Sequence, residues 1–116
     1  MTLTRQEYGV CAHKTVIHND TVYLAGMIAE TPFMSMKDQM AEVLQQMCDR
    51  LERAGSSKDK LIMVNIFCAD MRRVGELNEA WDAWIEPEIA PARACVEGRM
   101  SRPGWEVELT AVAALD

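Results

Sequence analysis

The sequence has few aromatic residues, few cysteines and no long hydrophobic run, and each shortage excludes a class of protein. Aromatic residues make up 6% of the 116 residues, and the four cysteines are widely spaced, without a C-x-x-C pair. A disulfide framework or a cysteine-based metal site usually has denser or more regularly spaced cysteines. No apolar stretch approaches the ~20 residues of a membrane span. We therefore expect a reduced, cytoplasmic protein that does not partner a membrane.

Basic residues are also scarce, which bears on nucleic-acid binding. The chain has 12 lysines and arginines against 18 aspartates and glutamates, giving a net charge of −6. Proteins that bind nucleic acids usually carry a basic patch or stripe. Here the basic residues are scattered, and Arg72-Arg73 is the only adjacent pair. We therefore expect no nucleic-acid partner.

The residues that are present have the balance of one globular domain spanning 1–116, with 49% hydrophobic and 26% charged residues. Hydrophobic periodicity predicts a β-hairpin, a helix, a strand, a second helix and two further strands. The expected elements are strands at 15–17 and 21–24, a helix at 35–54, a strand at 61–69, a helix at 71–85, and strands at 90–97 and 105–112, with an ambiguous edge strand near Leu3. This order predicts an α+β fold with both helices on one face of the sheet.

The predicted sheet has more apolar surface than its helices can cover. The segments at 61–69 and 105–115 are rich in apolar residues on both faces, whereas both helices lie on one face. An uncovered apolar face usually marks an interface between chains. We therefore expect a homo-oligomer.

Charged residues gather in the two C-terminal strands. Alternation places side chains two residues apart on the same face of a strand. A charge in a segment that is otherwise apolar needs a partner, a ligand or a wet cleft. The two sets are Arg93, Cys95 and Glu97 on the first strand, and Glu106, Glu108 and Thr110 on the second. The Pro-Gly turn signal at 101–104 by itself predicts that these strands form a hairpin.

Three motifs in this order resemble the reactive intermediate deaminase family, RidA or YjgF. They are Asn78-x-x-Trp81-x-x-Trp84, then Ala90-Pro91-x-Arg93-x-x-Val96, then Val107-Glu108-Leu109, and the first is similar to the small YoaB-like branch. The resemblance implies a chorismate-mutase-like mixed sheet, a homotrimer, and a small-molecule cleft at each boundary between chains. It also implies that the last strand lies antiparallel beside the strand at 61–69, in place of the hairpin.

The same resemblance assigns roles to named residues. Arg93 would grip a substrate carboxylate, and Glu108 would lie near the attacking water. The backbones of Cys95 and Gly26 would line opposite walls of the pocket, and their neighbours Ala94 and Ala25 complete the substrate-binding set.

Two departures from the family pattern concern hydroxyl groups. The family often has a tyrosine where this chain has Ala12, and a serine or threonine where it has Ala25. Both replacements remove a hydroxyl, and His13 could stand in for one of them.

The implied reaction is hydrolysis of an enamine or imine of an α-keto acid, of the 2-iminopropanoate type, to the keto acid and ammonia. It requires no metal or organic cofactor, and His13 and His18 lack a nearby ligand partner at a metal-binding spacing. The residues also allow plainer interpretations. Arg93 could form an ion pair with Glu97 or Glu106, Glu108 could pair with Arg99 or Arg102, and Cys95 could be a buried, inert thiol.

Three other functions compete with the deaminase. A non-catalytic module that binds a small carboxylate is suggested by the lost hydroxyls at positions 12 and 25. A ribonuclease or translation inhibitor comes with some members of the family, but the acidic charge and the lack of a histidine pair oppose it. A purely structural or chaperone-like trimer is the third.

Overall fold

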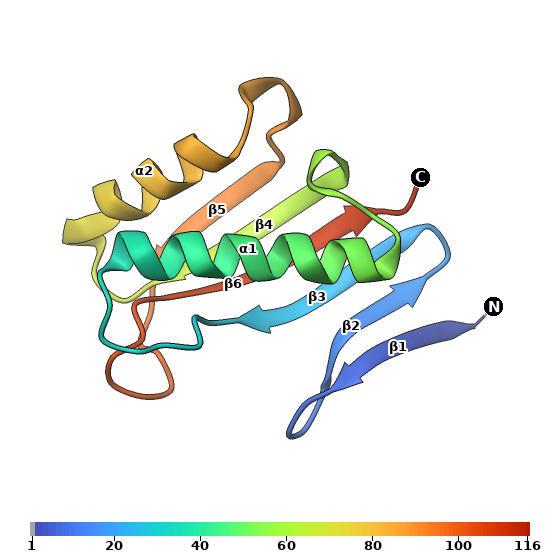
Figure 1. Cartoon of the computed structure of the whole chain (residues 1–116), viewed down its shortest axis with the longest axis horizontal. Coiled ribbons are helices and arrows are strands. Elements are labelled where there is room, and N and C mark those ends of the chain that lie inside the picture. The colour runs from blue at the N-terminus through green and yellow to red at the C-terminus, as the bar shows by residue number, and fades with distance from the viewer. Residues whose placement is uncertain (1) are drawn as a thin grey trace.

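The structure, a computed structural model, describes residues 2–116. Its strands form one mixed sheet in the order β1-β2-β3-β6-β4-β5, and both helices lie over one face of that sheet (Figure 1). The strands are β1 (Leu3–Tyr8), β2 (His13–His18), β3 (Thr21–Met27), β4 (Leu61–Cys68), β5 (Ala92–Glu97) and β6 (Val107–Ala114). The helices are α1 (Met36–Ala54) and α2 (Val74–Trp84), with 3-10 turns at Lys58–Lys60, Met71–Arg73 and Pro87–Ile89. The predicted α+β architecture, with two helices on one face, is confirmed.

Strand β6 lies between β3 and β4, away from β5. It is antiparallel to both neighbours, pairing Val112 with Tyr23 and Glu108 with Phe67, whereas β5 runs parallel to β4. The hairpin expected from the turn signal at 101–104 is therefore wrong, and the placement implied by the family resemblance is confirmed. The central position buries the inward side chains of β6, as with Leu109, which has no exposed surface.

The core lies between α1 and the sheet. The side chains that α1 buries recur at steps of three and four, as the periodicity predicts. Each one contributes about 1.5–3 kcal/mol by leaving water. They include the methionines Met36, Met40 and Met47 together with Val43, Leu44 and Leu51. These methionines therefore serve as packing residues.

Both ends of α1 are fixed by local capping interactions. The hydroxyl of Ser35 accepts a hydrogen bond from the Asp38 N–H at 3.1 Å. Gly55 ends the helix with a φ of 89°, a left-handed conformation that favours glycine. The Ser56 hydroxyl then donates to the Ala114 carbonyl at 2.6 Å, which ties the end of the helix to β6.

Gly75, in the first turn of α2, offers a test of these local rules. A Cβ added there would meet nothing within 4 Å. Glycine in a helix is less favourable than alanine by about 0.5–1 kcal/mol. We expect Gly75→Ala to raise the free energy of unfolding by about 0.5–1 kcal/mol in urea titrations. Ser35→Ala removes the N-cap hydrogen bond of α1 and should lower the free energy of unfolding by about 1 kcal/mol. A less stable Gly75→Ala variant would contradict this account.

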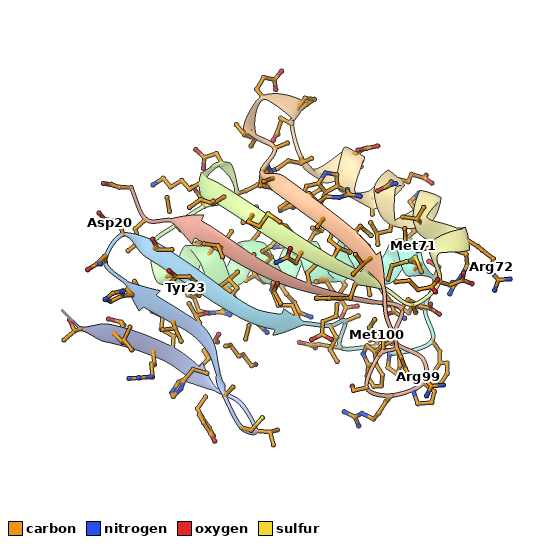
Figure 2. All side chains as sticks on the ribbon, turned by 180° about the vertical axis from the view of Figure 1, so that it is seen from behind. Asp20, Tyr23, Met71, Arg72, Arg99 and Met100 are labelled. Atoms are coloured by element: carbon orange, nitrogen blue, oxygen red, sulfur yellow. The ribbon has the colours of Figure 1, made fainter. Side chains whose placement is uncertain are left out.

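The face of the sheet away from the helices remains partly open in one chain. It is the near face in Figure 2, where Tyr23 on β3 is labelled. Tyr23 is 47% exposed and Val96 is 52% exposed, and Phe67 also reaches the surface. This exposed apolar surface agrees with the shortage of helical cover seen in the sequence.

Candidate functional site

Arg93 is held in one orientation by side chains of α2. It pairs with the buried Val64 across β4 and β5, so it faces the helices. Its Nη2 donates to Asn78 Oδ1 at 2.6 Å, and the guanidinium lies 5.1 Å from the centre of the Trp81 ring. A planar guanidinium fixed in this way is well suited to bidentate recognition of a carboxylate.

The acidic partners considered for Arg93 are engaged elsewhere. Glu106 forms an ion pair with Arg73, and Glu97 Oε1 accepts a hydrogen bond from the Met71 N–H at 2.9 Å. Within residues 2–116, no ion pair to Arg93 is formed. The alternative ion pair of Arg93 with Glu97 or Glu106 is therefore contradicted within the described residues.

Glu108 lies on the other face of the sheet, directly against Gly26. It pairs with Phe67, three residues after Val64, so its side chain points away from the helices. A Cβ at Gly26 would overlap Glu108 Oε2 and lie 3.2 Å from Glu108 Cδ. Glycine at this position therefore makes room for the carboxylate. The alternative ion pair of Glu108 with Arg99 or Arg102 is not formed in the part of the chain that the structure describes.

A bulge in β3 brings Gly26 to this position. The register of β3 against β6 shifts between Leu24 and Met27, and the strand continues past Gly26 to Met27. The Ala25 carbonyl at the bulge accepts a hydrogen bond of 3.4 Å from Arg50 Nη1, and Gln46 Nε2 donates to the Ile28 carbonyl at 2.8 Å. Helix α1 thus fastens the backbone on both sides of Gly26.

Cys95 and Ala94 point to opposite faces of β5. Cys95 pairs with the buried Ile66 and packs against the core, while Ala94 is exposed. Burial raises the pKa of the Cys95 thiol, and the nearby charge of Arg93 only partly offsets this. A thiol with a raised pKa is a poor nucleophile at neutral pH. Cys95 is therefore a weak candidate for a nucleophile.

Comparison with known proteins identifies the family. A family model described as "Endoribonuclease L-PSP" matches residues 8–115. The RutC family protein YoaB of Escherichia coli K12 is 35% identical over 115 residues, which cover 99% of this chain and 100% of that protein. A RutC family protein of Haemophilus influenzae is 35% identical over 114 residues, or 97% and 98% of the two chains. A crystal structure of a YjgF family member from Neisseria meningitidis superimposes with a TM-score of 0.95 at 34% identity, covering 100% and 97%.

The chain belongs to the YjgF/RidA family.

The fold of this YjgF/RidA family member places the predicted site residues on two opposite faces of the sheet. Arg93 and Cys95 face the helices, whereas Glu108 and Ala94 face the open side of the sheet, with Gly26 against Glu108. Strand β4 separates Arg93 from Glu108. One chain therefore does not bring these two side chains together.

Sequence reasoning missed two residues of this YjgF/RidA site. The sequence analysis gives Asn78 no role beyond its place in a family motif, although it stands three positions before Trp81 on α2, and this spacing puts both on the face that meets Arg93. Arg50 was not singled out, yet it is only 8% exposed. Burial lowers the pKa of Arg50, which is nevertheless protonated at neutral pH. The sequence signal that could have identified Arg50 is its position among the inward-facing residues of the helical period.

No group of three His, Cys, Asp or Glu side chains within residues 2–116 is arranged to hold a metal ion. None of the helices in this part of the chain is both long enough and apolar enough to cross a membrane.

Proposed function

We propose that the chain is a deaminase that hydrolyses enamines and imines of α-keto acids, of the 2-iminopropanoate type, to the keto acid and ammonia. The observation that carries this proposal is the Arg93 guanidinium, oriented by Asn78 and Trp81 and without an ion-pair partner in residues 2–116. Membership in the YjgF/RidA family supports it, since the family resemblance of the sequence implies this activity.

In the proposed reaction, Arg93 donates two hydrogen bonds to the substrate carboxylate and fixes the C=N carbon in space. Water adds to that carbon, Glu108 accepts a proton from the water, and the nitrogen takes up a proton. The carbon–nitrogen bond of the resulting amino alcohol then breaks as its nitrogen takes the proton held by Glu108 and its hydroxyl loses a proton to water, releasing ammonia and the keto acid. A positioned general base contributes ~10²–10⁴ in rate, and orientation of the substrate adds to this.

We further propose that the cleft is formed between chains of a homotrimer. Arg93 and Glu108 lie on opposite faces of the sheet with β4 between them, so a small substrate held by one does not reach the other in the same chain. The exposed apolar residues Tyr23 and Val96 on the open face offer an interface for a second copy. The free thiols of Cys11, Cys48, Cys68 and Cys95 support a reducing, cytoplasmic location as part of the proposal.

A module that binds a small carboxylate without turnover is the second candidate. The replacement of the family hydroxyls by Ala12 and Ala25 favours it, because a pocket without them retains Arg93 and Gly26 but has fewer groups to hold water. Such a module would be stabilised by 2-oxobutanoate in thermal unfolding and would leave imines untouched.

We do not propose a ribonuclease, although the matching family model carries that description. Acid–base cleavage of RNA by histidines would need two imidazoles close together. His13 and His18 stand at opposite ends of β2, about 17 Å apart in an extended strand. They therefore cannot act as a pair in one chain.

The direct test generates 2-iminopropanoate from alanine with an amino-acid oxidase and follows its decay. We expect micromolar protein to accelerate the decay, because Arg93 and Glu108 together orient the imine and activate water. Heat-denatured protein serves as the control. Decay that is unchanged by the native protein would count against the deaminase and leave the binding module.

A further inference from the structure

A hollow of about 650 Å³ lies in the loop between β5 and β6, beyond the end of β4. Small-molecule sites commonly measure about 300–1,000 Å³, so the hollow is large enough for a substrate group. Figure 2 labels Arg99 and Met100 in this loop, where it projects from the end of the sheet. Its walls include Ala69, Glu97, Gly98, Arg99, Arg102 and Trp105.

Two arginines of this loop have no carboxylate partner among residues 2–116. Arg53, Arg72 and Arg73 each form an ion pair with a glutamate or aspartate. Within residues 2–116, neither Arg99 nor Arg102 forms one, although acidic residues outnumber basic ones by 18 to 12 in the whole chain. Glu97, which also lines the hollow, is engaged by the Met71 N–H. The walls of the hollow therefore carry the two positive charges of Arg99 and Arg102 against the one negative charge of Glu97.

The loop that carries these arginines is anchored to the rest of the chain. The Arg102 guanidinium lies 5.1 Å from the centre of the Trp105 ring, and Trp105 Nε1 donates to the Ala29 carbonyl at 2.7 Å. The Gly104 carbonyl accepts from the Phe33 N–H and from Nε2 of the buried Gln39, both at 2.8 Å. Because the loop is already held in place, it loses less conformational entropy when an anion binds.

The hollow adjoins Glu108 through one side chain. Phe67 is the cross-strand neighbour of Glu108. A Cβ at Gly98, which lines the hollow, would lie 3.9 Å from Phe67 Cδ1. Phe67 therefore connects Glu108 with the wall of the hollow that also includes Arg99 and Arg102.

From this arrangement we propose that Arg99 and Arg102 form a second anion subsite, which selects imines with a carboxylate in their side chain. The proposal rests on the proposed deaminase function and names its substrate class. Arg93 binds the carboxylate next to the C=N carbon, and the loop arginines bind the distal one by charge-assisted hydrogen bonds. An imine such as 2-iminoglutarate is then a better substrate than 2-iminopropanoate.

The test compares these two imines, generated in situ from glutamate and from alanine by the corresponding oxidases. We expect kcat/KM for 2-iminoglutarate to exceed that for 2-iminopropanoate by about tenfold, the effect of one charge-assisted contact. Replacing both Arg99 and Arg102 by alanine should bring the ratio to about one. The double lysine variant should keep part of the preference, because it retains the charges and keeps a cation over Trp105. Arg5→Ala, which removes an exposed arginine from the far edge strand, is the matched control and should leave the ratio unchanged.

A binding measurement separates failure of the subsite from failure of the deaminase. Thermal unfolding is followed with 2-oxoglutarate and with 2-oxobutanoate, which are stable keto acids of the two classes. Greater stabilisation by 2-oxoglutarate that is lost in the double alanine variant supports the subsite even if neither imine is hydrolysed. Equal acceleration of both imines, or equal stabilisation by both keto acids, overturns the subsite and leaves the deaminase standing.

Discussion

The Arg93→Ala variant is expected to lose its acceleration of 2-iminopropanoate decay, with kcat/KM reduced by about 10²–10⁴. Each hydrogen bond between charged groups contributes about 1.5–3 kcal/mol, and a bidentate contact loses two of them. Asn78 and Trp81, which orient Arg93, carry no positive charge and so cannot replace its contact with the substrate carboxylate. The measurement is the initial rate of imine decay at several substrate concentrations.

Two further variants distinguish substrate recognition from a structural contribution of Arg93. Arg93→Lys retains the charge but lacks the fork of parallel donors, so we expect partial activity. Asn78→Ala leaves the guanidinium in place with one orienting contact fewer and should show a smaller loss than Arg93→Ala. Circular dichroism and urea unfolding check that the variants fold. Wild-type kinetics from folded Arg93→Ala would refute the mechanism.

Gly26→Ala should abolish activity while the fold is preserved. The added Cβ overlaps Oε2 of Glu108, which is the far end of a flexible side chain and can move. Gly26 itself is outside the left-handed region of φ, so its backbone tolerates alanine. The carboxylate that accepts the proton is displaced, and we expect a loss of ~10²–10⁴ in kcat, the contribution of a general base.

The control for Gly26→Ala is Gly75→Ala, the same substitution at a site where the added methyl group meets no neighbour within 4 Å. Glu108→Gln should cost as much as Gly26→Ala. Because both act on the same carboxylate, the double variant should lose no more than either single variant. Additive losses would show that Gly26 acts independently of Glu108, for example by contacting the substrate through its backbone.

The local elements of the fold could be predicted because their determinants lie close together in the sequence. The helix at 35–54 has its cap at Ser35, its apolar period and its terminal Gly55 within one segment, and α1 begins and ends where they indicate. The turn between β2 and β3 is also local, and Asn19 takes the positive φ that such a tight turn uses.

The position of β6 could not be derived from local signals. The turn signal at 101–104 is compatible with a hairpin, and the choice between neighbours is made by burial over the whole sheet. Only the family resemblance supplied the correct placement. The contact of Gly26 with Glu108 could not be derived from local signals either, because it depends on a bulge in one strand and the register of another.

The site was predictable in its residue types and less so in its geometry. Alternation and apolar surroundings drew attention to Arg93 and Glu108, but placed them on separate strands without relating the strands. The support from Asn78 and Arg50 depends on helix-to-sheet packing, which a single sequence does not encode locally.

Because Arg93 and Glu108 lie on opposite faces of one sheet, the activity of such a protein would depend on its concentration. If each cleft takes its guanidinium from one subunit and its carboxylate from the next, an isolated subunit is inert however well it folds. Dilution would then switch the chemistry off through dissociation, and the cell's protection against reactive imines would rise more steeply than the amount of protein synthesised.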